Sequence, residues 1–136
     1  MMVAGHAIAW GVACNDEIVV GAGAFRHLLQ RGFHPKMLLM HEGEEIGEWV
    51  KFEEDERGLL CVGELSDSPR ARMAREMFEA GKLTGLSMGR KKAIAKPIAP
   101  GASFIAIMLD VNEISLVDEP GCPLALITEF CQGSAG

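Results

Sequence analysis

A serine between two glycines is the residue of this sequence best suited to nucleophilic chemistry. Residues 85–89 read Gly-Leu-Ser-Met-Gly, so Ser87 occupies the centre of a G-x-S-x-G pattern. In that pattern a serine hydroxyl is presented for attack on a carbonyl carbon. The chain contains 16 glycines, and at that frequency the pattern arises by chance about one time in ten. The surrounding sequence must therefore decide whether Ser87 is a nucleophile.

That context excludes the α/β-hydrolases, in which the pattern spans a strand, a turn and a helix. Residues 90–96 alternate between polar and apolar side chains, as a strand does, and no histidine follows Ser87. In that fold the histidine of the triad comes after the serine. A serine nucleophile still needs only a general base within hydrogen-bond reach, from any part of the chain.

The four histidines all precede Ser87, at positions 6, 27, 34 and 41. The first three are interpreted as surface residues of a strand edge, a helix and a turn. His41 differs, because it ends the apolar strand Lys36–Met40 and precedes the acidic loop Glu42–Glu45. A side chain at the end of a rigid strand is both well positioned and open to solvent. His41 is therefore the candidate base.

Two helices are predicted to flank the strands. The first covers residues 23–31 and ends at Gly32, with one apolar face formed by Phe25, Leu28 and Leu29. The second begins at the capping residue Ser68 and ends at Gly81, with Pro69 in the first helical position. Its apolar stripe consists of Ala71, Ala74, Met77 and Phe78.

The remaining regular structure is predicted to be β. Four segments carry β-branched or alternating apolar residues between turn signals: Ile46–Glu53, Gly58–Leu65, Ser87–Lys96 and Ser103–Val117. A polar hairpin loop at 54–58 and a proline-rich connection at 97–101 separate them. The fold class is therefore mostly β with flanking helices, a compact and largely antiparallel barrel. Residues 1–130 form a single domain, and residues 131–136 form a disordered tail.

Composition excludes several classes of function. The formal charge of −6 disfavours a protein that tracks nucleic-acid phosphates. The longest apolar stretches are too short to span a bilayer, and the first residues do not resemble a signal peptide. Four cysteines lack C-x-x-C spacing, and position 45 is glutamate where an H-E-x-x-H motif starting at His41 needs histidine. No metal or cofactor is expected, and the cysteines are interpreted as reduced thiols.

Four blocks of the chain, taken in order, resemble the caudovirus prohead proteases, which are relatives of the herpesvirus assemblins. Each block shares a few residues with a characteristic segment of that family. They are GAF at 23–25, MLLMH at 37–41 with IGEW at 46–49, AGKLTGLSMG at 80–89, and EISLV at 113–117 with Pro120 and Pro123. The proline that usually precedes the first block is missing here, and the scaffold-like tail that many members carry does not follow.

The resemblance implies a herpes-protease-like β-barrel with Ser87 as nucleophile, His41 as base and a third polar residue near Glu113. It also implies cleavage of scaffold and capsid-protein segments, including self-cleavage, inside the immature phage head in the host cytoplasm. The active unit would be a homodimer or another self-associated form, with Met73 and Met77 as adaptable contacts. Neither nucleic acid nor membrane is an expected partner.

Several assignments stay open at the level of the sequence. Glu113 either orients His41 or is a solvent-facing strand residue, and Ser115, which shares its strand parity, is a weaker candidate. The row Ile105, Ile107, Leu109 and Val111 is predicted to face inward with Glu113. Main-chain N–H groups in the turn Asp118–Gly121 are candidates for the oxyanion hole. The competing functions are a non-catalytic capsid assembly protein and a small-molecule esterase.

Overall fold

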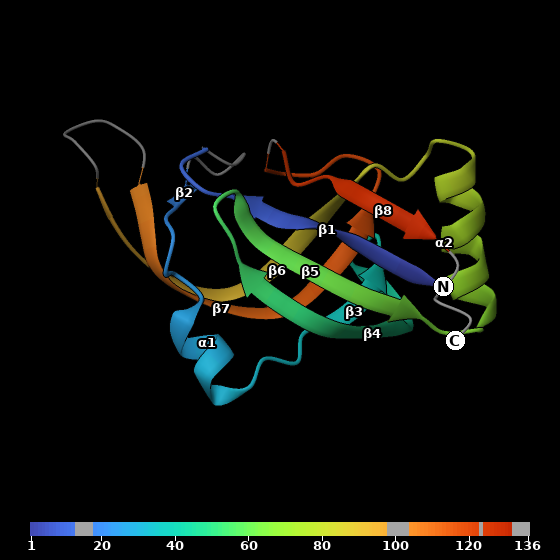
Figure 1. Ribbon diagram of the computed structural model, residues 1–136, viewed down its shortest axis with the longest axis horizontal. Coiled ribbons are helices and arrows are strands. Elements are labelled where there is room, and N and C mark those ends of the chain that lie inside the picture. Colours follow the sequence, from blue (N-terminus) through green and yellow to red (C-terminus); the bar gives the residue numbers. More distant parts are fainter. Residues whose placement is uncertain (13–17, 98–103, 123, 132–136) are drawn as a thin grey trace.

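The structure is a computed structural model and describes residues 1–12, 18–97, 104–122 and 124–131. Within them, strands account for most of the regular structure, and two helices flank the sheet (Figure 1). The elements in chain order are β1 Met2–Ala9, β2 Ile18–Val20, α1 Arg26–Arg31, β3 Lys36–Leu39, β4 Glu42–Glu54, β5 Gly58–Leu65, α2 Pro69–Glu79, β6 Gly85–Pro97, β7 Phe104–Val117 and β8 Ile127–Cys131. This confirms the predicted fold class.

The described strands form one curled sheet. Its strand order is β2-β7-β3-β4-β5-β1-β8, and β6 pairs with β7. Main-chain hydrogen bonds join the start of β6 to the segment before β8: Leu86 N–H donates to the Ala125 carbonyl at 2.9 Å, and Ile127 N–H to the Thr84 carbonyl at 3.0 Å. Because these bonds connect opposite ends of the strand order, they bring the sheet towards a closed barrel.

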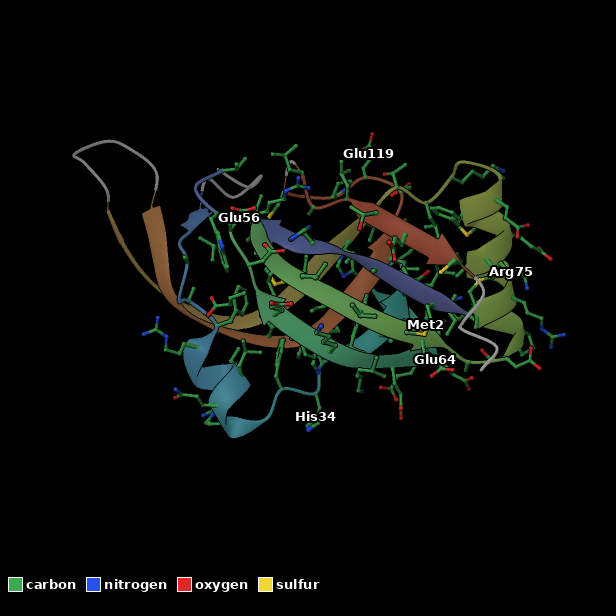
Figure 2. The ribbon with its side chains drawn as sticks, viewed as in Figure 1. Met2, His34, Glu56, Glu64, Arg75 and Glu119 are labelled. Atoms are coloured by element: carbon green, nitrogen blue, oxygen red, sulfur yellow. The ribbon has the colours of Figure 1, made fainter. Side chains whose placement is uncertain are left out.

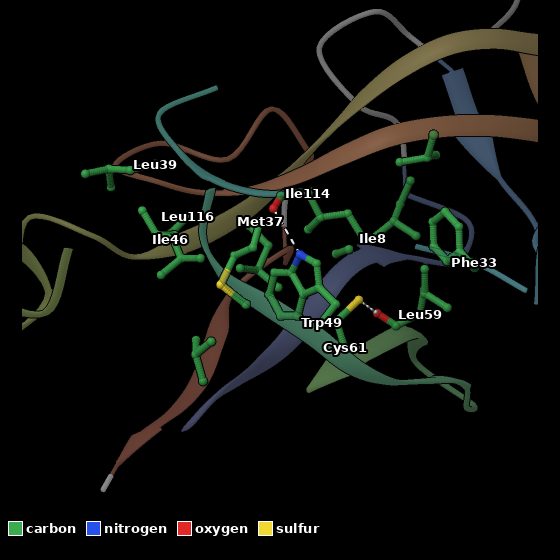
Figure 3. Close-up of a cluster of buried hydrophobic side chains, with 14 of the residues drawn as sticks. Ile8, Phe33, Met37, Leu39, Ile46, Trp49, Leu59, Cys61, Ile114 and Leu116 are labelled. Carbon is green, nitrogen blue, oxygen red and sulfur yellow. Dashed lines mark hydrogen bonds between the residues drawn. The ribbon is translucent and has the colours of Figure 1, made fainter. Parts of the chain in front are cut away.

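The core lies on the inner face of this sheet, where Trp49 of β4 is surrounded by aliphatic side chains (Figure 3). Trp49 is 7% exposed, and its indole N–H donates to the main-chain carbonyl of Ile114 at 3.1 Å. A buried indole N–H left without an acceptor would be costly, so this bond lets a large aromatic ring fill the core. It also ties β4 to β7.

The second helix is nearly as predicted. Pro69 occupies its first turn, the Ser68 hydroxyl accepts a hydrogen bond from Ala71 N–H at 3.1 Å, and Gly81 follows its end with φ of 74°. Ala71 and Ala74 are buried against the sheet. Figure 1 shows α2 at one end of the sheet and α1 near the opposite end.

The first helix is shorter than predicted. It begins at Arg26 rather than at residue 23, because Gly23 has φ of 93° and residues 21–26 form hydrogen-bonded turns instead. Its predicted apolar face is nevertheless correct, since Phe25 and Leu28 are buried and Leu29 packs against the core.

Other expectations need correction. His6 is a half-buried residue whose Nε2 lies 2.8 Å from Asp55 Oδ2, so it is not a free surface residue. Cys122 is disulfide-bonded, so not all four thiols are reduced. Cys61 and Cys131 are free, and burial raises the pKa of the Cys61 thiol. Cys131 belongs to β8, whereas the rest of the predicted tail and residues 98–101 of the predicted connection lie outside the described residues.

We expect Asp55 to stabilise the β4–β5 hairpin. Its carboxylate accepts hydrogen bonds from the main-chain N–H groups of Arg57 and Gly58 and contacts the His6 ring. Asp55→Ala should lower the free energy of unfolding by about 1–2 kcal/mol at pH 7, measured by urea titration. Glu56→Ala, a change at the exposed neighbour labelled in Figure 2, should stay within about 0.5 kcal/mol of wild type.

The effect of Asp55→Ala should also depend on pH. Burial raises the pKa of the Asp55 carboxyl, but hydrogen bonds from His6, Gly58 and Arg57 together outweigh it and hold the pKa below its ordinary value. The stabilisation is therefore complete above the pKa of the unfolded chain, about 3.9, and is lost as the pH falls through the lower folded value. A difference between wild type and variant that does not shrink on acidification would contradict this account.

Candidate functional site

Three neighbouring strands bring the candidate residues together. Strand β7 pairs with β3 along one edge and with β6 along the other, so that Ser115 lies opposite both Leu38 and Ser87. Two residues before Ser115 in β7, Glu113 lies opposite Gly89 of β6. Residues directly opposite each other in a sheet point to the same face, so Ser87, Ser115 and Glu113 share one face.

That face is the outer one. Leu86 and Ile114, which alternate with these residues, are fully buried in the core. The prediction that Glu113 continues an inward-facing row is therefore wrong at this level of the strand, because the inward positions are Ile114 and Leu116. Val111 of the same predicted row is buried in the core as expected, and the side chains of Ile105, Ile107 and Leu109 lie outside the described residues.

His41 reaches the same face from a tight turn between β3 and β4. Leu39 pairs with Glu42, and the two intervening residues, Met40 and His41, have φ of 54° and 63°. Positive φ at both central residues is the requirement of the type I′ hairpin turn, which favours asparagine and glycine. The predicted loop at 42–45 is thus part of β4 by its bounds, although its residues are exposed as expected.

Ser87, His41 and Glu113 form a chain of hydrogen bonds. His41 Nε2 lies 3.0 Å from Ser87 Oγ, and His41 Nδ1 lies 2.5 Å from Glu113 Oε1. The glutamate side chain is 8% exposed and the histidine side chain 43%. The carboxylate therefore approaches the ring from the protein side, while the ring itself is open to solvent.

This geometry determines which ring nitrogen can act as a base. A carboxylate beside Nδ1 accepts the Nδ1–H hydrogen bond, so the neutral ring carries its lone pair on Nε2. That atom faces the Ser87 hydroxyl. A serine, a histidine and a carboxylate in this order are the arrangement by which serine hydrolases generate a nucleophile, independently of fold and of the order of the residues in the chain.

Ser115 holds two parts of the site together. Its hydroxyl donates to Glu113 Oε2 and accepts from the main-chain N–H of His41 at 3.2 Å. The side chain is fully buried. Ser115 does not contact the histidine ring, so it supports the turn and the carboxylate rather than replacing Glu113 as the ring's partner.

The glycines of the G-x-S-x-G pattern leave room for neighbours. A Cβ at position 89 would overlap with the carboxylate of Glu113, and a Cβ at position 85 would lie 2.5 Å from the Ala125 carbonyl oxygen. Ser87 itself lies within β6, which continues as a strand to Pro97 instead of turning into a helix. The pattern therefore reflects packing across strands, which confirms that it is not the elbow of an α/β-hydrolase.

The predicted oxyanion turn directly follows β7. The Thr84 hydroxyl donates to the Asp118 carbonyl at 2.6 Å, and the Glu119 N–H already donates to the Asp118 carboxylate at 2.7 Å. A role for Glu119 N–H would require that bond to break, so the oxyanion donors stay a prediction. The sequence analysis did not identify Arg70, whose side chain contacts the turn that carries His41. The one signal in the sequence was a positively charged residue in the first turn of a helix, where the helix dipole disfavours it.

Comparison with known proteins identifies the family of the chain. The sequence profile of the caudovirus prohead serine proteases matches residues 2–132. The chain belongs to this family, and the resemblance drawn from the four sequence blocks is confirmed. No curated protein matches the chain. Neither described helix is long and apolar enough to cross a membrane.

We expect Gly89→Ala to disconnect Glu113 from His41, because the new Cβ and the carboxylate would occupy the same space. Proteolytic activity should fall about 100-fold, the scale of a displacement of about 1 Å in a catalytic group. The matched test is a double-mutant cycle with Glu113→Ala. Once the carboxylate is gone, the alanine at 89 should add little further loss. Additive losses would show that Gly89 acts in another way.

Proposed function

We propose that this protein is a serine endopeptidase in which Ser87 is the nucleophile, His41 the general base and Glu113 the residue that orients His41. The hydrogen-bonded chain from Ser87 Oγ through His41 to Glu113 is the observation that carries the proposal. Membership of the prohead serine protease family supports it.

The reaction uses His41 twice. Its Nε2 takes the proton from the Ser87 hydroxyl as Oγ bonds to the carbonyl carbon of the substrate, and it then gives that proton to the leaving amine as the C–N bond breaks. The same nitrogen next takes a proton from water as the water oxygen bonds to the acyl carbon, and it gives that proton to Ser87 Oγ as the ester C–O bond breaks, which releases the new carboxyl end. The Glu113 carboxylate stabilises the imidazolium at both stages.

The openness of the site favours a polypeptide substrate over a small ester. The His41–Ser87 hydrogen bond lies at an exposed position on the outer face of the sheet. An extended chain can lie across such a surface, whereas a small-molecule site usually encloses most of its ligand. The open site and the family together support scaffold and capsid-protein segments as the substrates. We expect cleavage, including self-cleavage, to take place inside the immature phage head in the host cytoplasm. Self-association stays a prediction; Met73, half of whose surface is exposed, could contribute to it.

Ser87→Ala should abolish proteolysis and labelling by a fluorophosphonate, on the order of 10⁶-fold in kcat, because no other group can form the acyl intermediate. Ser66→Ala, at an exposed serine remote in sequence, should retain both. The thermal midpoints of both variants should stay close to wild type. A wild-type protein that fails to label would favour the non-catalytic assembly protein, and one that cleaves p-nitrophenyl esters but not scaffold protein would favour the esterase.

Glu113→Gln should keep the fold but slow proteolysis, because a neutral amide stabilises the imidazolium formed during the reaction less than a carboxylate does. The value of kcat, measured with scaffold protein as substrate, should fall by up to about 10⁴-fold. If both Glu113→Gln and Glu113→Ala cleave at the wild-type rate, Glu113 has no role in catalysis.

A further inference from the structure

Arg70 of α2 bridges the two ends of the turn that carries His41. Its Nη2 donates to the main-chain carbonyls of Leu39 and Glu42, both at 3.1 Å. These two residues immediately precede and follow Met40 and His41. A single guanidinium nitrogen of α2 therefore links the residue before the turn to the residue after it.

The turn needs such support. A left-handed conformation is unfavourable for a residue with a side chain, and Met40 and His41 both adopt it. Strained backbone persists only where its surroundings fix it from several sides. Strand β7 provides one side, through Ser115 Oγ for His41 N–H and the Leu116 carbonyl for Met40 N–H. Arg70 provides the other.

The position of Arg70 has no local explanation. It lies in the first turn of α2, where the helix dipole disfavours a positive charge. Within the part of the chain that the structure describes, no carboxylate pairs with it, and its Nε is buried without a partner. A residue that breaks a local rule without a local gain is expected where function requires it.

Two further features fit the guanidinium to this place. Gly43 has φ of 80°, which favours glycine, and a Cβ there would lie 2.6 Å from Arg70 Nε, so the missing side chain also leaves space for the guanidinium beside the turn. The helix that presents Arg70 is itself firmly held, since Ala71 and Ala74 are buried and Phe78 stacks on Phe130 of β8 with ring centroids 4.4 Å apart. A rigid element is what accurate positioning requires.

We propose that Arg70 is a positioning residue, which fixes the left-handed turn and thereby holds the His41 ring between Glu113 and Ser87. The inference rests on the proposed function of that site. It assigns Arg70 no contact with substrate, so its loss should slow the chemical step and leave substrate binding almost unchanged.

The test compares Arg70→Met, Arg70→Lys and the control Arg75→Met. Arg75 lies on the outer side of the same helix (Figure 2), where it pairs with Glu79 at 3.2 Å. Arg70→Met should lower the rate constant of fluorophosphonate labelling and kcat about 10- to 100-fold, with KM within about twofold of wild type. Arg70→Lys should lie between Arg70→Met and wild type, and Arg75→Met should match wild type.

A merely structural role would lower the thermal midpoint but leave labelling unchanged well below it, and that result overturns the proposal. If Arg70→Met does not fold, Arg70→Lys decides, because it keeps the positive charge but loses the planar guanidinium, and wild-type labelling in Arg70→Lys then overturns the proposal.

A nuclear magnetic resonance measurement separates this inference from the proposed function. The His41 Nδ1–H proton, shared with Glu113, should give a downfield signal in wild type that weakens or disappears in Arg70→Met and persists in Arg75→Met. An unchanged signal in Arg70→Met overturns the positioning role. Failure of the wild-type protein to label overturns the peptidase proposal instead, and the signal still tests Arg70.

Discussion

The pairing of β7 along both of its edges is the constraint on which the site depends. One edge places β3 so that its chain turns back at Met40 and His41, and the other places Ser87 of β6 opposite Ser115. Main-chain hydrogen bonds hold these registers. A slip of one residue would turn every side chain of a strand to the opposite face and would expose the apolar residues of the core, so the burial of the core also fixes the registers. Distances of about 3 Å between residues far apart in the sequence follow from this pairing.

Burial of the Glu113 carboxylate is the main electrostatic requirement of the arrangement. A buried charge without partners is very costly. Here Ser115 donates to one oxygen and His41 to the other, while the absence of a side chain at Gly89 makes the space. The same contacts that satisfy the carboxylate also fix the histidine ring, so one set of hydrogen bonds serves both stability and chemistry.

Much of this structure could be predicted from local signals, and the remainder depends on neighbours remote in sequence. The cap at Ser68, the proline at 69 and the stripe of alanines define α2, and alternation defines the main strands, because each depends on adjacent residues. Ser87, His41 and Glu113 were named from motif, position and resemblance, and the structure brings them together. Met40-His41 contains neither the asparagine nor the glycine that signals a left-handed hairpin turn, and its supporting contacts come from β7 and α2, which are remote in sequence. The inward direction assigned to Glu113 is wrong, although Val111 of the same row is in the core, because the register between β6 and β7 shifts between these two residues, and Ile114 and Leu116 take the inner positions after the shift.

Strand β7 carries the core on one face and the site on the other, residue by residue. Ile114 and Leu116 pack beneath Trp49, while Glu113 and Ser115 point outward between them. Active sites built on loops can open by local fluctuation while the rest of the molecule stays intact. This site shares the backbone of β7 with the buried core of the protein. The strand pairing that holds the core therefore also holds the backbone of Glu113 and Ser115, whereas His41 lies on a turn and can be displaced while the fold stays intact.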